Sequence, residues 1–149
     1  MTNELKWDLR FLEMAKLVST WSKDSSTKVG AVLVRPDKTV QSVGFNGFAS
    51  KMRDNPSHYN KREEKLSRII HAEINSLLFA QDSVKGSTLY TFPFCCCDRC
   101  SVQMIQAGVV RFVFPAPTED ALSRWGDSFQ RAQQYFEETD VKFTEIGFQ

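Results

Sequence analysis

All four cysteines of this 149-residue chain fall between Cys95 and Cys100, in the stretch TFPFCCCDRC. Neighbouring cysteines cannot readily pair with one another, because a disulfide needs well-separated Cα atoms and converging Cβ vectors. A fold held together by intramolecular disulfides is therefore nearly excluded. A chain of this length can bury a sufficient core as one domain without such links. Clustered, unpaired thiols are typical of a reducing compartment, so we expect a cytoplasmic protein.

The composition is that of an ordinary globular protein, with 42% hydrophobic and 25% charged residues. A formal net charge of +1 gives no reason to expect nucleic acid or a membrane as an obligatory partner. The first residues, MTNELKWDLRFLEMAK, are charged and amphipathic and do not resemble a signal peptide. We find no apolar run as long as a membrane span.

Hydrophobic periodicity and turn residues predict an alternation of helices and strands. The expected helices cover residues 5–22, 66–81, 98–108 and 120–138, the expected strands cover 29–34, 39–45, 87–92, 109–114 and 141–146, and a polar loop covers 46–62. The later strands follow helical crossovers, so they should lie parallel to one another. This order predicts the α/β class, with a mixed five-stranded sheet between helices in a three-layer α/β/α arrangement.

A metal site is indicated by Cys97 and Cys100, whose C-x-x-C spacing allows two thiolates to bind one zinc ion. The same spacing also serves redox chemistry. His71, at the N-terminal end of the preceding helix, offers a third ligand, and three protein ligands leave a fourth position for water, as in catalytic zinc sites. Glu73 follows two residues later, where a carboxylate could take up and pass on the proton of that water.

Each of these residues has an ordinary structural interpretation when taken alone. A buried histidine is usually structural, and a glutamate near a helix start usually complements the helix dipole. The joint pattern H-x-E followed by C-x-x-C is the signature of zinc-dependent nucleobase deaminases, so we assign His71, Cys97 and Cys100 as zinc ligands and Glu73 as the catalytic residue. Cys95 and Cys96 are interpreted as packed small residues.

Around this motif the chain resembles the deoxycytidylate (dCMP) deaminase family, which has the cytidine deaminase-like fold. The resembling segments are SKDSSTKVGAVLV, VGFNG, HAEINSL, GSTLYTFPFCCCDRCSVQMIQAG and VKFTEI. The resemblance implies a single deaminase domain over residues 1–149 in a viral (phage) or bacterial member, which if viral would act in the host cytoplasm. The family has a proline immediately before its first cysteine ligand, where this chain has Cys96. This departure bears on the backbone of the pocket wall and not on zinc ligation.

The resemblance also implies a reaction and a substrate. Water activated by zinc would attack C4 of the cytosine of dCMP, and Glu73 would protonate N3 and then the departing ammonia, which yields dUMP for thymidylate synthesis. Asn46 would hydrogen-bond the deoxyribose, although Asn-Gly is also an ordinary turn pair. The remaining residues expected to bind substrate, chiefly its 5′-phosphate, are Ser22, Lys23, Thr27, Arg124 and Trp125.

Members of this family are commonly hexamers that dCTP activates and that dTTP inhibits together with Mg²⁺. The loop 46–62 is the expected triphosphate site, and it also fits an ordinary basic surface loop. The residues expected to contact the effector are Lys51, Arg53, His58, Lys61 and Arg62.

Three other functions share part of this pattern. A deaminase that edits RNA or DNA would have the same zinc site but should have a basic surface, which the charge balance does not favour. A deaminase of free nucleosides would lack phosphate-binding residues. A zinc-binding interaction module without activity would explain the thiols but would leave Glu73 without a role.

Overall fold

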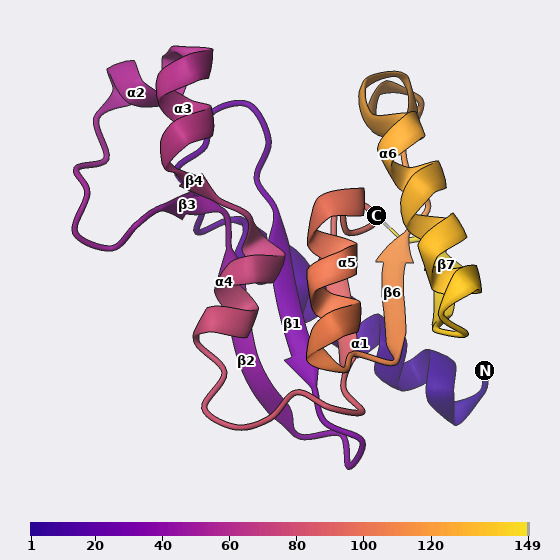
Figure 1. Cartoon of the computed structure of the whole chain (residues 1–149). Coiled ribbons are helices and arrows are strands. Elements are labelled where there is room, and N and C mark those ends of the chain that lie inside the picture. Colours follow the sequence, from indigo (N-terminus) through magenta and orange to yellow (C-terminus); the bar gives the residue numbers. More distant parts are fainter. Residues whose placement is uncertain (149) are drawn as a thin grey trace.

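The computed structural model describes residues 1–148, and its centre is a five-stranded sheet in the order β2-β1-β5-β6-β7 (Figure 1). These strands are β1 (Gly30–Val34), β2 (Val40–Phe45), β5 (Thr88–Phe92), β6 (Arg111–Pro115) and β7 (Lys142–Ile146). Strand β1 is antiparallel to both of its neighbours, whereas β5, β6 and β7 are parallel. The predicted mixed sheet with parallel later strands is thus confirmed.

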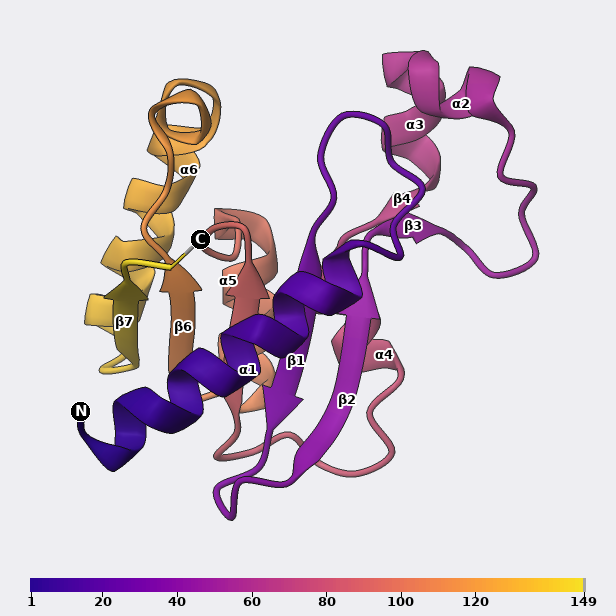
Figure 2. The same cartoon turned by 180° about the vertical axis from the view of Figure 1, so that it is seen from behind.

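Helices cover both faces of this sheet. The helices are α1 (Asn3–Ser19), α2 (Pro56–Asn60), α3 (Arg62–Arg68), α4 (Ala72–Leu78), α5 (Asp98–Ala107) and α6 (Glu119–Glu138). Helices α2 and α3 pack against each other beyond the end of the sheet, and the other four cover it. Helix α1 crosses one face (Figure 2), while α4, α5 and α6 lie on the other (Figure 1). The predicted three-layer α/β/α arrangement is confirmed.

Alternating side chains of the strands build a core on each face of the sheet. Val32 and Tyr90 pack toward Phe11 of α1, while Leu33 and Phe112 belong to the larger core beneath α4, α5 and α6. All five residues of β1 are buried, because both faces of this strand are covered.

None of the helices in the described part of the chain has the length and apolar character that crossing a membrane requires.

The helix predicted over 66–81 is wrong, because the chain is interrupted in its middle. Helix α3 ends at Arg68, and the short strand β4 (Ile69–Ile70) follows it. The two isoleucines pair antiparallel with β3 (Gly47–Phe48). This pairing requires an extended backbone at Ile69 and Ile70, so a helix cannot continue through them. His71 is extended, with φ −67° and ψ 151°, and is the N-cap of α4.

The predicted loop 46–62 also contains regular structure. It includes β3 and α2, whose N-cap Asn55 accepts a hydrogen bond from the Ser57 N–H at 3.0 Å. The rings of Phe48 and Tyr59 stack with centroids 4.0 Å apart and close the loop on itself. A contact between aromatic residues eleven positions apart has no signature in local periodicity.

Helix α4, which follows His71, is fixed directly against the backbone of β2. A Cβ atom added at Gly44 would collide with the backbone of Ala72 and Ser76 in α4. The Asn75 Nδ2 donates a hydrogen bond to the carbonyl of Phe45 at 2.8 Å. The absence of a side chain at Gly44 therefore sets the position of the helix that begins next to His71.

We expect Gly44→Ala to lower the free energy of unfolding by about 1–3 kcal/mol, because α4 must move away from β2 to admit the methyl group. Urea denaturation measures this change. Gly47→Ala is the matched control, since its added Cβ would meet no atom within 4 Å. Equal stability of the two variants would contradict the close packing of β2 and α4.

Candidate active site

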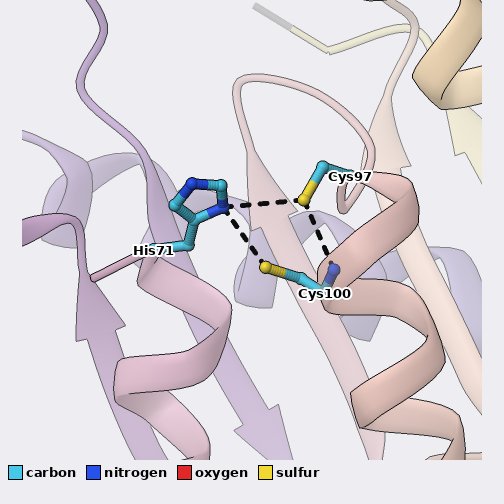
Figure 3. A group of neighbouring side chains, drawn as sticks. All are labelled: His71, Cys97 and Cys100. Atoms are coloured by element: carbon cyan, nitrogen blue, oxygen red, sulfur yellow. Dashed lines mark hydrogen bonds between the residues drawn. The ribbon is translucent and has the colours of Figure 1, made fainter. Parts of the chain in front are cut away.

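Three potential metal ligands meet between the N-termini of two helices (Figure 3). The Nδ1 of His71 lies 3.5 Å from the Sγ of Cys97 and 3.2 Å from the Sγ of Cys100. His71 is the N-cap of α4, Cys97 is the N-cap of α5, and Cys100 lies in the first turn of α5. The Cys97 Sγ also accepts a hydrogen bond from the Cys100 N–H at 3.4 Å. The structure thus brings together the three ligands that the sequence predicts.

The geometry of this group fits a zinc ion. Within residues 1–148 it is the one set of three or more potential ligands whose donor atoms all lie within 4.8 Å of one another. A tetrahedral ion bound at about 2.3 Å from sulfur and about 2.05 Å from nitrogen implies a nitrogen–sulfur separation of about 3.6 Å. The two observed separations are close to this value. Two cysteines and one histidine, with a position left open, are a donor set of catalytic zinc sites.

The pKa values of His71, Cys97 and Cys100 are raised by hydrogen bonds with neighbouring side chains. The hydrogen bond with Cys97 raises the pKa of His71 to about 9, with a further contribution from the charge of Glu73 and an opposing one from burial. The pKa of the Cys97 thiol is raised by its hydrogen bond with Cys100 and by burial. Because zinc binds thiolate and neutral imidazole, its binding must displace these protons, so its affinity should increase with pH.

Glu73 lies in the first turn of α4 and is only 5% exposed. Its backbone carbonyl accepts a hydrogen bond from Ser76, whereas its carboxylate has no hydrogen bond within the described part of the chain. The residue lines the same cavity as His71 and Cys97. A carboxylate in this position is available to exchange protons with a molecule in the cavity.

The cavity next to these residues has a volume of about 260 Å³ and two chemically distinct parts. One wall is aromatic, with the ring of Phe94 4.9 Å from that of Trp125 and 5.3 Å from that of Phe129. The rest of the lining includes polar and charged residues, among them Asp24, Ser26, Thr27, Asn46, Arg62, Lys65 and Arg124. The cavity therefore offers an apolar surface to one part of a ligand and cationic groups to another.

Of the predicted substrate-binding residues, Thr27, Asn46, Arg124 and Trp125 line this cavity. The guanidinium of Arg124 lies 4.1 Å from the centroid of the Trp125 ring, and its Nη2 is 3.5 Å from the Ser26 Oγ. These contacts hold a cation at the edge of the cavity.

Ser22 and Lys23 are not among the residues that line it, which departs from the predicted phosphate contacts. The hydroxyl of Ser22 is buried and donates to the backbone carbonyl of Asn46 at 2.8 Å. Lys23 forms an ion pair with Asp54 at 2.6 Å and lines a neighbouring cavity instead. The loop turns between Ser22 and Thr27, so that Asp24, Ser26 and Thr27 reach the cavity whereas Ser22 and Lys23 do not.

The residues predicted to bind an effector are not all in one place. Arg62 lines the cavity next to His71 and Glu73. Lys51, Arg53 and Lys61 are exposed, and His58 is partly buried. Arg62, the first residue of α3, therefore lines the same cavity as Lys65 and Arg124.

Sequence reasoning missed Asp24 and Lys65, which form an ion pair at 2.8 Å beside the cavity. Asp24 lies in a polar run that reads as an ordinary loop, and Lys65 belongs to the charged run KREEK. No local signal could have found them, since the pair joins residues 41 positions apart.

Comparison with known proteins agrees with this site. Residues 5–116 match the family described as "Cytidine and deoxycytidylate deaminase zinc-binding region". An "Uncharacterized deaminase in luxG 3'region" of Aliivibrio fischeri is 41% identical over 93% of this chain and 92% of its own length. The deoxycytidylate deaminase of Mus musculus is 31% identical over 74% of this chain, and the match spans 65% of the mouse protein.

Solved structures share the fold. The dCMP deaminase of the cyanophage S-TIM5 matches in its apo form with a TM-score of 0.72 over 98% of this chain and 100% of that chain, at 23% identity. The complex of that phage protein with dCMP and dUMP matches with the same TM-score at 24% identity. The cytidine deaminase-like fold is thereby confirmed. Together with the family match, which includes all three predicted zinc ligands, these findings show that the chain belongs to the cytidine and deoxycytidylate deaminase family.

Proposed function

We propose that this protein hydrolyses dCMP to dUMP and ammonia. The observation that carries the proposal is one cavity that joins a zinc-type ligand group and a buried carboxylate to an aromatic wall and to three cationic side chains. The parts of a cytosine nucleotide correspond to these groups. Its reactive ring atoms would meet the ligand group and the carboxylate, its flat ring face would meet the aromatic wall, and its phosphate would meet the cations. The phage relative with a bound dCMP and dUMP supports the choice of nucleotide.

His71, Cys97 and Cys100 would hold zinc, which when bound lowers the pKa of a water molecule toward neutrality. The Glu73 carboxylate is placed to accept a proton from the attacking water. It delivers this proton to N3 of the ring as the C4–O bond forms. It then transfers the proton of the new C4 hydroxyl to the amino nitrogen, so that the C4–N bond breaks and ammonia leaves. Glu73 is buried from bulk solvent but lines the cavity, so a molecule bound there would be its partner in proton exchange.

The aromatic wall is suited to bind the base. The rings of Phe94, Trp125 and Phe129 form one side of the cavity, and the ring of Phe94 is tilted against each of the other two. Offset and tilted aromatic contacts of this kind favour a flat ring as the occupant.

The cations are suited to bind the phosphate. Lys65 is already paired with Asp24, whereas Arg62 and Arg124 are exposed and have no buried carboxylate partner within the described residues. Arginine presents planar donors that match phosphate oxygens. We therefore assign the phosphate to Arg62 and Arg124, with the hydroxyls of Ser26 and Thr27 beside them.

The other functions considered from the sequence are less well supported. A free-nucleoside deaminase would have no use for the two arginines, and a non-enzymatic zinc module would have no use for Glu73. An editing deaminase needs a basic surface for nucleic acid, and the net charge is only +1. We also infer a single deaminase domain, because the two cores share one sheet.

Activation by dCTP, inhibition by dTTP with Mg²⁺, assembly into a hexamer and a cytoplasmic location rest on the family resemblance and on the composition. They stay predictions. Lys51, Arg53, His58 and Lys61 remain the residues that we assign to an effector, and all of them except the partly buried His58 are exposed. Initial rates over a range of dCMP concentrations, with and without dCTP, would test regulation, since hyperbolic curves unaffected by dCTP would exclude it.

We expect Cys97→Ser to lose the zinc that the unmodified protein binds at about one ion per chain, because a serine hydroxyl is a poor ligand in this donor set. Elemental analysis after gel filtration measures the metal. Cys95→Ser is the matched control, because Cys95 also lines the cavity but is not part of the ligand group. Retention of zinc in Cys97→Ser with loss in Cys95→Ser would contradict the assignment.

We expect Glu73→Gln to keep its zinc and to bind dCMP, yet to lose about 10²–10⁴-fold in kcat, since the amide cannot carry the proton. Ammonia release measures turnover, and elemental analysis shows that the metal is still present. A kcat above about a tenth of the unmodified value would refute the role of Glu73.

We expect Arg124→Gln and Arg62→Gln to raise the KM for dCMP by about ten- to a hundredfold, as loss of a charge-assisted hydrogen bond implies. The KM for deoxycytidine, which lacks the phosphate, should hardly change. Arg10→Gln is the control, because Arg10 is exposed on α1 on the opposite face of the sheet. Equal effects on both substrates, or faster turnover of deoxycytidine or single-stranded DNA by the unmodified protein, would contradict dCMP as substrate.

A further inference from the structure

Helix α5 carries two of the three metal ligands, and its N-terminus needs hydrogen bonds that the ligands do not supply. The first N–H groups of a helix have no partner within it and are usually satisfied by the side chain of the N-cap residue. Here the N-cap is Cys97, whose sulfur belongs to the ligand group and accepts a long bond from the Cys100 N–H at 3.4 Å. The N–H of Asp98 therefore needs another acceptor.

Ser128 of helix α6 is this acceptor. Helices α5 and α6 pack side by side on one face of the sheet (Figure 1). The Ser128 hydroxyl accepts from the Asp98 N–H at 3.0 Å and donates to the Asp98 Oδ1 at 2.9 Å. The same Oδ1 accepts from the Arg99 N–H at 2.9 Å. Two successive N–H groups at the start of α5 are thus satisfied by one hydroxyl and by the carboxylate that it contacts.

The direction of the Ser128 hydroxyl differs from that of an ordinary helical serine. Serine inside a helix often donates to a carbonyl of the preceding turn. Ser123 in the same helix does so, with a bond of 2.8 Å to the Asp120 carbonyl. Ser128 instead makes both of its hydrogen bonds with Asp98, in a different helix. Its hydroxyl is therefore used to join α6 to α5.

This contact also joins the ligand group to the wall of the cavity. Ser128 is partly buried and lines the cavity, as do Arg124 and Trp125, which lie about one helical turn before it. Arg131 follows Ser128 by about one turn and donates to the Asp98 Oδ2 at 2.7 Å. Helix α6 therefore contacts the C-x-x-C turn through a partly buried hydroxyl and through a guanidinium that is 50% exposed.

We propose that Ser128 is a positioning residue that caps helix α5 in place of Cys97, so that the C-x-x-C turn keeps its shape while the Cys97 sulfur stays available to zinc. Ser128 acts through Asp98 and is not itself a ligand. The inference rests on the zinc site of the proposed function and is independent of the identity of the substrate. Residues that orient metal ligands in this way typically change metal affinity by about 10–100-fold.

The rate at which a chelator removes zinc from the purified protein tests this role without use of the reaction. We expect Ser128→Ala to release zinc to the coloured chelator pyridylazoresorcinol about ten- to a hundredfold faster than the unmodified protein, because the C-x-x-C turn loses its cap. Ser128→Thr keeps a hydroxyl and should restore slow release. Release from Ser128→Ala at the unmodified rate would overturn the proposal, and so would equally fast release from Ser128→Thr.

Ser123→Ala is the matched control, because it removes the same group from the same helix, where the hydroxyl bonds only within α6. It should release zinc at the unmodified rate, and release as fast as from Ser128→Ala would refute a specific role of Ser128. Arg131→Gln separates the cap from the charge. Because Arg131 is half exposed, we expect a smaller effect than that of Ser128→Ala. An equal or larger effect would assign the turn to the ion pair of Arg131 with Asp98 and overturn the role of the hydroxyl.

A general loss of stability would also speed the release of zinc, and Phe136→Leu controls for it. Phe136 is buried in α6 about two turns beyond Ser128, and its ring stacks on Phe112 of β6. Thermal denaturation measures the stability of both variants. We expect Ser128→Ala to release zinc faster than Phe136→Leu even where Phe136→Leu is the less stable of the two. The opposite order would indicate a general loosening of α6 and would refute the proposal.

Failure of the proposed function would look different from failure of this inference. Elemental analysis of the unmodified protein comes first, and a protein that binds no zinc would refute both. A zinc-loaded protein that does not deaminate dCMP would refute the substrate but leave the role of Ser128 intact, since the release assay contains no nucleotide. An active, zinc-loaded protein whose Ser128→Ala variant releases zinc at the unmodified rate would refute this inference alone.

Discussion

The site depends on two helix N-termini that face each other across the carboxyl end of β5. His71 and Cys97 are both extended N-cap residues, so their side chains leave the helices at the point where the helix dipoles are positive. This polarity opposes the hydrogen bonds and the burial that raise the pKa values of the Cys97 and Cys100 thiols, whose protons a bound zinc ion would displace. Because α4 is docked on β2 and α5 follows β5, the sheet sets the distance between the ligands.

A second constraint is the burial of charge beside the cavity. Asp24 is almost completely buried, and it is tolerated because backbone N–H groups, Asn46 and Lys65 all donate to it. The same contacts join the loop after α1, the end of β2 and helix α3. One buried carboxylate therefore holds together three segments of the chain beside the cavity.

Local pattern and tertiary pairing disagree most clearly around His71. Periodicity favours one helix from 66 to 81, but pairing of Ile69 and Ile70 with β3 interrupts it. The interruption converts His71 from a residue inside a helix into an N-cap, which allows its Nδ1 to reach both thiols. Hydrophobic periodicity therefore gives a wrong prediction at the point where the ligand group requires an extended backbone.

The sequence by itself determined the α/β order, the parallel later strands, the zinc-type ligand set and the position of Glu73. These follow from short-range periodicity and from spacings that the motif preserves. Only the tertiary structure decided which side chains line the cavity: Arg62, Asp24 and Lys65 lie in its wall, whereas Ser22 and Lys23 lie outside it. The physical reason is that a cavity wall is assembled from side chains far apart in the chain, whose directions depend on how the loops turn and pack.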